Sequence, residues 1–135
     1  MVNVLTVEEF FGIQRNLKKL SETWSDLWAM LHISQASPTH IICLKFSDVE
    51  NGRLVLRSNR RLALRYVEIS PGIEKILVSR RTSYPEDEYL FQSHTNRTLS
   101  NPRPVTLIAF NAALKTACRN VTCKTVSSKS AAFLK

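Results

Sequence analysis

The chain has 135 residues, of which 44% are hydrophobic and 22% charged, a composition that excludes a largely disordered protein. We expect residues 1–135 to form a single domain, in which the segment 125–135 is either mobile or docked on a partner. No apolar run approaches the length of a membrane span, and the N-terminus lacks the pattern of a secretion signal. We therefore expect a cytoplasmic protein without a membrane partner.

The positive charge is concentrated in the later parts of the chain. The formal net charge is +8, with four Lys and Arg against six Asp and Glu in residues 1–50, eight against two in 51–85, and seven against none in 89–135. Each phosphate that a basic surface neutralises releases counterions, so this asymmetry favours a nucleic-acid partner. The alternative is a solvated basic surface that only keeps the protein soluble.

Two amphipathic helices are predicted at the N-terminus, over residues 7–20 and 22–34. Thr6 and Glu9 form a capping box before the first helix, because each side chain can bond the backbone N–H of the other residue. His32 lies beside the apolar stripe of the second helix and is expected to be a packed or exposed bystander. That stripe consists of Trp24, Leu27, Trp28 and Leu31.

A third helix is predicted from Ser37 and Pro38 to about Leu44, because serine caps a helix and proline is tolerated at its first position. Cys43 lies in this apolar run and is expected to be a small core residue. The other cysteines are Cys118 and Cys123, and no C-x-x-C spacing or histidine cluster accompanies them. We therefore expect no zinc site, no disulfide framework and no cofactor.

A basic hairpin is predicted next. Asn51-Gly52 marks a turn, residues 53–58 alternate apolar and polar side chains as a half-buried strand does, and Asn59-Arg60 leads to a second strand over 62–69. The elements after the hairpin are a helix capped by Ser70 over 71–79, a polar loop over 80–88, an apolar anchor at 89–91, a long loop over 92–103 and a helix over 105–119. The expected buried face of that last helix is Leu107, Phe110, Leu114 and Ala117. Segment 125–134 is either a short helix or frayed.

Several stretches resemble the catalytic domain of tyrosine recombinases and phage integrases. Residues 37–49 resemble the segment that reads roughly G-L-R-x-S-E-L-L-x-L-x-W-x-D-I in that family. Weaker matches occur in the same order as in the family, at Leu5-Thr-Val-Glu-Glu-Phe, Val67-Glu-Ile-Ser, Tyr89-Leu-Phe and Arg103-Pro-Val-Thr. The resemblance implies a mainly α fold with a small antiparallel β-hairpin, an α+β domain truncated before the nucleophile.

The residues at the family's catalytic positions imply that the chain is not an enzyme. The family needs a tyrosine nucleophile, two arginines, a hairpin lysine and a His-x-x-Arg cluster around the scissile phosphate. Here the degenerate positions are Ser37, Arg60, Ser127 and Ser130, and the sequence ends at Lys135 before the expected tyrosine. An arginine such as Arg60 is a poor proton donor, and losing the charge of the others removes most of the transition-state stabilisation. No glycine-rich phosphate loop, H-E-x-x-H or G-x-S-x-G motif indicates another enzyme class.

The same resemblance implies a set of residues that contact double-stranded DNA. The set is Lys45, Arg53, Arg57, Arg60, Arg61, Arg65, Arg103, Thr106, Asn111, Lys115 and Arg119. The cations would bind phosphates, which position a protein without reading sequence. Thr106 and Asn111 are the residues of the set expected to reach base edges.

Three functions remain open from the sequence. The first is a non-catalytic accessory or architectural DNA-binding protein of a mobile element such as a plasmid or phage, acting in recombination, excision or conjugative DNA processing. The second is an interaction module that assembles with a recombinase, a relaxase or itself. The third is an integrase remnant without function. The preserved caps and amphipathic faces indicate that folding has been retained.

Overall fold

The computed structural model describes residues 4–58, 62–94, 101–132 and 134. The chain forms two compact units. Unit 1 combines Met1–Pro38 with Thr106–Lys135, and unit 2 is the continuous stretch Thr39–Val105. The single domain expected from the chain length stays a prediction.

Unit 1 begins with the two predicted helices, α1 (Val7–Leu20) and α2 (Glu22–Ser34), whose limits are confirmed. The capping box is formed, because Thr6 Oγ1 accepts from Glu9 N at 3.1 Å and Glu9 Oε1 accepts from Thr6 N at 2.9 Å. Ser21 ends α1 and caps α2, which explains why two helices follow each other with one residue between them.

Aromatic rings fill the centre of unit 1. Trp28 is fully buried, stacks on Phe10 with 5.2 Å between ring centroids, and donates from Nε1 to the carbonyl of Phe10 at 3.2 Å. Phe110 lies 5.6 Å from the half-buried Trp24 and 6.5 Å from Trp28, again between ring centroids. The adjacent helices α1 and α2 therefore share one core with the helix that carries Phe110, far later in the sequence.

The third of these helices is α5 (Leu107–Ala117), which begins two residues later and ends two residues earlier than the predicted 105–119. It is tied to α1, since Asn16 Nδ2 donates to the carbonyl of Ala117 at 2.9 Å. The predicted apolar face is confirmed at its buried positions, Phe110, Leu114 and Ala117. Leu107 is only half-buried.

The C-terminal segment packs on unit 1. Of the two alternatives left open by the sequence, the short helix is confirmed, as the 3₁₀ helix η3 (Ser130–Ala132). Leu134 pairs with Leu5 in an isolated parallel bridge. His32 Nδ1 is 2.8 Å from the carbonyl of Ala131, so this histidine is a packed residue that links α2 to η3.

Unit 2 begins within α3 (Pro38–Ile42), whose first residue is the expected proline. The helix ends at Ile42 rather than near Leu44, and the next residues lead to the 3₁₀ helix η1 (Phe46–Asp48). Ile41 and Leu44 take the buried positions. Cys43 is exposed, so the prediction of a core cysteine is wrong, because the early end of the helix turns this residue outward. Cys118 is buried and Cys123 is exposed.

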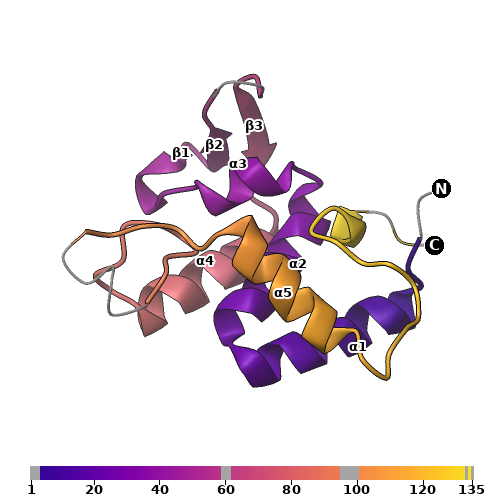
Figure 1. Ribbon diagram of the computed structural model, residues 1–135. Coiled ribbons are helices and arrows are strands. Elements are labelled where there is room, and N and C mark those ends of the chain that lie inside the picture. The colour runs from indigo at the N-terminus through magenta and orange to yellow at the C-terminus, as the bar shows by residue number, and fades with distance from the viewer. Residues whose placement is uncertain (1–3, 59–61, 95–100, 133, 135) are drawn as a thin grey trace. The chain divides into compact units, whose positions relative to one another are not determined.

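Unit 2 contains a small antiparallel sheet with strand order β1-β2-β3 (Figure 1). Its strands are β1 (Val49–Glu50), β2 (Arg53–Leu56) and β3 (Arg65–Glu68). The predicted turn at Asn51-Gly52 is confirmed, with φ of 51° and 74°, the left-handed values that a two-residue hairpin turn requires.

The sheet differs from the predicted hairpin in two ways. Both predicted strands are longer than the observed ones, and the two-residue strand β1 was not foreseen. The predicted alternation in the first strand is wrong at Val55, which is buried like Leu54 and Leu56 because both faces of β2 are covered. The predicted turn at Asn59-Arg60 lies outside the described residues.

After the sheet, α4 (Pro71–Ser83) is one turn longer than the predicted helix 71–79. Its cap is confirmed, since Ser70 Oγ accepts from Ile73 N at 3.4 Å. The prediction that Arg80 begins a polar loop is wrong, because this side chain is only 2% exposed and holds the helix end in the core of unit 2.

The apolar anchor at 89–91 is confirmed, with Leu90 and Phe91 buried. Its backbone pairs with the chain after α3, as Leu90 N donates to the carbonyl of Leu44 at 2.9 Å. Arg80 Nε donates to the carbonyl of Leu90 at 3.1 Å, and its guanidinium lies 5.8 Å from the ring centroid of Phe91. Within the described ranges, no helix is both long and apolar enough to cross a membrane.

Candidate nucleic-acid interface

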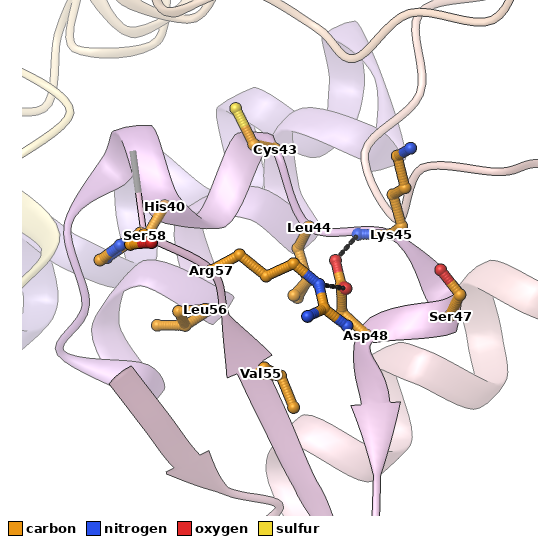
Figure 2. A pocket seen from close by; sticks show the side chains of 10 residues that line it. All are labelled: His40, Cys43, Leu44, Lys45, Ser47, Asp48, Val55, Leu56, Arg57 and Ser58. Atoms are coloured by element: carbon orange, nitrogen blue, oxygen red, sulfur yellow. Dashed lines mark hydrogen bonds and ion pairs between the residues drawn. The ribbon is translucent and has the colours of Figure 1, made fainter. Parts of the chain in front are cut away.

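A hollow of about 320 Å³ lies beside the sheet of unit 2 (Figure 2). Asp48 organises it: its side chain is 9% exposed, Oδ1 accepts from Arg57 Nε at 2.7 Å, and Oδ2 accepts from the backbone N of Lys45 at 3.0 Å. The lining residues are His40, Cys43, Leu44, Lys45, Ser47, Asp48, Val55, Leu56, Arg57 and Ser58. A buried carboxylate that accepts two hydrogen bonds fixes the position of the arginine at the edge of the hollow.

The two cations of this hollow are already paired with carboxylates. Arg57 also approaches Glu50 at 3.8 Å, and the hydrogen bond to Asp48 raises the pKa of its guanidinium. Lys45 lies 3.2 Å from Glu88, which raises the pKa of the ammonium group. The positive charge that the sequence assigned to these two positions is therefore largely compensated within unit 2.

Two further arginines of the predicted set lie on the sheet. The guanidinium of Arg53 lies 4.4 Å from the ring centroid of Tyr66, a stacked geometry that leaves the outer N–H groups able to donate. Arg65 is exposed at the start of β3. Arg60 and Arg61 lie outside the described residues. In the described part of the hairpin, the charge of Arg57 is compensated by Asp48.

His40 was not singled out from the sequence. It is 7% exposed and lines the hollow, and burial, aided by the charge of Arg65, lowers the pKa of its imidazole. The side chain is therefore neutral at neutral pH and adds no charge to this site. Its position three residues after Ser37, on the inner side of a short helix, is the signal that could have indicated burial.

A second hollow, of about 330 Å³, lies in unit 1 and brings together two of the degenerate regions. Ser37 lines it together with Ser128 and Lys129. These two residues lie between Ser127 and Ser130, the positions that correspond to the family's His-x-x-Arg cluster. The complete lining is Leu31, Gln35, Ala36, Ser37, Pro38, Ser128, Lys129 and Ala132. Only Lys129 among these described residues carries a charge.

The serines of this region hold the local backbone. Ser130 is buried, and its Oγ accepts from the backbone N of Ser127 at 3.0 Å. Ser127 is exposed, and its Oγ accepts from the backbone N of Lys129 at 3.3 Å. These hydroxyls close a turn before η3, which gives the two serines a structural role.

A further hollow, of about 480 Å³ and lined by three cations, lies at the C-terminal end of α5 in unit 1. Lys115 and Arg119 are exposed there and belong to the predicted set, whereas Lys124 was not in it. Lys124 Nζ donates to Glu9 Oε1 at 2.6 Å and to the carbonyl of Val4 at 2.9 Å. This cation holds the chain after α5 against the start of α1, so Lys115 and Arg119 carry the outward charge.

The two side chains predicted to reach base edges both accept hydrogen bonds from the backbone of unit 1. Thr106 is exposed and caps α5, since its Oγ1 accepts from Ala109 N at 3.1 Å. Asn111 Oδ1 accepts from the backbone N of Ser128 at 3.0 Å. An asparagine with its carbonyl oxygen engaged in this way is poorly placed for the two-bond contact with adenine, which needs that oxygen as an acceptor.

Arg103, a cation of the predicted set, is exposed before the start of α5.

The ion pair of unit 1 supports a pH prediction. The hydrogen bond from Lys124, then those from Thr122 and the backbone of Thr6, lower the pKa of Glu9 from 4.5 to about 2. Because the folded pKa lies below the ordinary value, the stabilisation is complete above about pH 5 and is lost as the pH falls toward 2. We expect about 1 kcal/mol from this pair after solvent screening.

Urea unfolding of the wild type and of Glu9→Gln between pH 2.5 and 6 checks this expectation. The difference in free energy of unfolding between the two proteins narrows as the pH falls, because only the wild type has a carboxylate that protonates at position 9. A difference that stays constant over this pH range contradicts the pairing of Glu9 with Lys124. Lys124→Met raises the pKa of Glu9 and shifts the loss of stability to higher pH.

No protein-family model matches the chain, and no curated protein matches it by sequence. Solved structures do match. A lambda integrase dimer bound to a COC′ core site has a TM-score of 0.76 at 11% identity, covering 96% of this chain and 38% of that one. The lambda integrase catalytic core has the same score and identity, covering 96% and 78%. XerH site-specific recombinase bound to its difH substrate has a TM-score of 0.61 at 15% identity, covering 97% and 40%.

The chain therefore has a tyrosine recombinase-like catalytic-domain fold, as the resemblance of short motifs implied. The predicted α+β class is confirmed, with a three-stranded sheet in place of the simple hairpin. The chain spans 38% of the length of the first lambda integrase chain, and the low identities establish the fold alone. Over the described ranges, no three His, Cys, Asp or Glu side chains gather as metal ligands would.

Proposed function

We propose that this protein binds double-stranded DNA in a recombination-related role without cleaving it. The observation that carries the proposal is the exposed pair Lys115 and Arg119 beside the basic hollow of unit 1, on a recombinase-like fold. Residues 89–135 contain no acidic residue, so a phosphate backbone meets little repulsion from this part of the sequence. Two of the similar structures are bound to a COC′ core site and to a difH substrate, which supports a nucleic-acid partner.

The proposed absence of cleavage rests on the hollow that Ser37 lines. Phosphoryl transfer depends on positive groups arranged around the developing charge. Among the described residues that line this hollow, Lys129 is the one that carries a charge. The family resemblance would instead place an arginine at position 37 and a His-x-x-Arg cluster near positions 127–130. We expect no covalent protein–DNA adduct on a suicide substrate, and any adduct would overturn the non-catalytic part of the proposal.

The proposed setting is an accessory or architectural role on a mobile element, in recombination, excision or conjugative DNA processing. The fold supports this setting through its likeness to recombination proteins. Sequencing of genomic fragments that the protein retains would test it directly. Enrichment of fragments from the ends or transfer origin of a mobile element is the expected result, and a uniform genomic background would contradict it.

Removal of the exposed cations of α5 tests duplex binding. We expect Lys115→Gln with Arg119→Gln to weaken binding roughly tenfold near 100 mM salt and to reduce the slope of log affinity against log salt by about 1.8, for two lost phosphate contacts. Titrating a labelled 30-base-pair duplex at several salt concentrations measures both quantities.

The matched control neutralises two exposed lysines at the end of α1, Lys18→Gln with Lys19→Gln, for the same change in net charge. Equal losses in the two double variants would mean that overall charge, rather than this surface, governs binding. Arg57→Gln is an unsuitable probe, because it leaves the buried carboxylate of Asp48 without its cation. Arg53→Gln probes the sheet without that penalty.

A second candidate is a module that assembles with a recombinase, a relaxase or itself. The favouring observation is an exposed apolar pair on one face of α1, Val7 at 48% and Phe11 at 51%. The C-terminal segment is less suited to docking on a neighbour, since Leu134 and Ser128 are bonded within unit 1. Sedimentation of Phe11→Ser tests the candidate: self-association predicts a smaller mass than the wild type, and an identical monomeric mass for both argues against it.

A further inference from the structure

The outward face of α5 changes from apolar to cationic along its length. Ile108 is 85% exposed, the largest value among the exposed large hydrophobic residues of the described chain. Ala112 and Lys115 follow at helical spacing on the same side, and Arg119 continues that line just beyond the end of the helix. Ile108 is therefore the apolar side chain of this stripe that is most open to a partner.

The opposite face holds α5 rigidly in unit 1. Phe110 packs against Trp24 and Trp28, and Leu114 is fully buried. The helix ends are also fixed, because Thr106 caps the first turn and Asn16 bonds the carbonyl of Ala117. A partner therefore meets a preformed helix, without a cost for ordering it.

Polar groups leave little of this face for hydrogen-bonded readout. The Oγ1 of Thr106 and the Oδ1 of Asn111 accept bonds from within unit 1. What remains toward solvent near the start of α5 is aliphatic: Ile108, Ala109 and Ala112. In the major groove of DNA, the group that such side chains recognise is the C5-methyl of thymine.

Resting on the proposed function, we infer that the outward face of α5 lies in the major groove and reads thymine through its methyl group. Ile108 makes the main apolar contact, and the small Ala109 and Ala112 let the helix backbone approach the base edges. Lys115 and Arg119 bind the flanking phosphates. An 11-residue helix is roughly 16 Å long, enough to follow a groove about 12 Å wide for half a turn of DNA.

Charge complementarity favours DNA over a protein as the occupant of this face. The cations lie on the same stripe as the apolar residues, and Lys124 of the adjoining hollow neutralises the carboxylate of Glu9. A protein partner would have to bring an acidic patch directly beside an apolar one. Duplex DNA presents phosphates and thymine methyl groups together on every A·T-containing groove wall.

The test compares duplexes that contain thymidine with duplexes that contain deoxyuridine, a nucleoside that lacks only the C5-methyl group of the base. The wild type is titrated with two pools of 20-base-pair duplexes of identical A·T-rich random sequence, one synthesised with thymine and one with deoxyuridine. We expect tighter binding to the thymine pool by roughly fourfold for each methyl group contacted. Ile108→Ala removes most of this preference and keeps the affinity for the deoxyuridine pool.

The control is Phe11→Ala, which removes another exposed apolar side chain, on α1. It keeps the thymine preference of the wild type if α5 makes the contact. Equal binding of both pools by the wild type overturns the methyl readout and leaves the proposed function standing. Absence of binding to either pool at low salt overturns both. A lower oligomeric mass for Ile108→Ala with unchanged DNA affinities identifies the face as an interface between copies and also overturns the inference.

Discussion

Trp28→Ala is expected to destabilise the protein by about 3–5 kcal/mol, the range for deleting a large buried aromatic side chain. Trp28 has no exposed surface, stacks on Phe10, and lies near Phe110 of α5. Its removal opens a cavity where α1, α2 and α5 meet. This is a large fraction of the total stability of about 5–15 kcal/mol that is typical of a domain.

Chemical unfolding followed by far-ultraviolet circular dichroism measures the loss. Trp28→Phe separates two contributions, because it keeps a ring on Phe10 and removes the Nε1 hydrogen bond to the carbonyl of that residue. We expect about 1–2 kcal/mol for this milder change. Phe11→Ala is the matched control at a half-exposed aromatic position, and a loss as large as that of Trp28→Ala would contradict the assigned core.

Arg80→Ala is expected to destabilise unit 2 by about 2–4 kcal/mol, because it removes buried packing and a hydrogen bond together. The guanidinium donates to the carbonyl of Leu90 and lies 4.8 Å from the ring centroid of Tyr84 and 5.8 Å from that of Phe91. It therefore joins the end of α4 to the apolar anchor. The anchor in turn pairs with the backbone after α3.

Arg80→Met tests which contribution dominates. Methionine restores much of the volume but leaves the carbonyl of Leu90 without this donor, so the loss is expected to fall to about 1–2 kcal/mol. Lys75→Ala, at an exposed position of the same helix, is the control and is expected to change stability by less than about 0.5 kcal/mol. Equal effects of Arg80→Ala and Lys75→Ala would refute the structural role of Arg80.

The two tryptophans also test whether the units unfold together. Trp24 and Trp28 both belong to unit 1, so tryptophan fluorescence follows unit 1, whereas circular dichroism follows the helices of both units. Coincident transitions are expected if residues 1–135 behave as the single domain predicted from the chain length. Arg80→Ala sharpens the comparison, because it weakens unit 2 alone and separates the two transitions if they are independent.

The limits of α1 and α2 could be predicted because their signals are local. A capping box, a serine between the helices and apolar residues at helical spacing all lie within a few positions of one another. The turn at Asn51-Gly52 was predictable for the same reason. Burial of Val55 was not, since it depends on what covers the second face of the sheet rather than on the strand itself.

The charged residues show why the site was harder to predict than the fold. Composition places arginine and lysine at the surface, yet Arg80 lies in the core and Arg57 is held by Asp48. The pair of Glu9 and Lys124 joins residues 115 positions apart, a distance over which no local pattern carries information. Counting cations therefore located the basic part of the chain but not which side chains remain available to a phosphate.

The division of the sequence between the units has a consequence for synthesis on the ribosome. Unit 2 is one uninterrupted stretch, whereas α1 and α2 find α5 only after residues 107–117 have been made. At about 5–20 residues per second, the apolar faces of the first two helices wait several seconds for their partner. The aromatic core around Trp28 cannot be completed before α5 has been made, and until then the exposed apolar faces of α1 and α2 favour aggregation of the nascent chain.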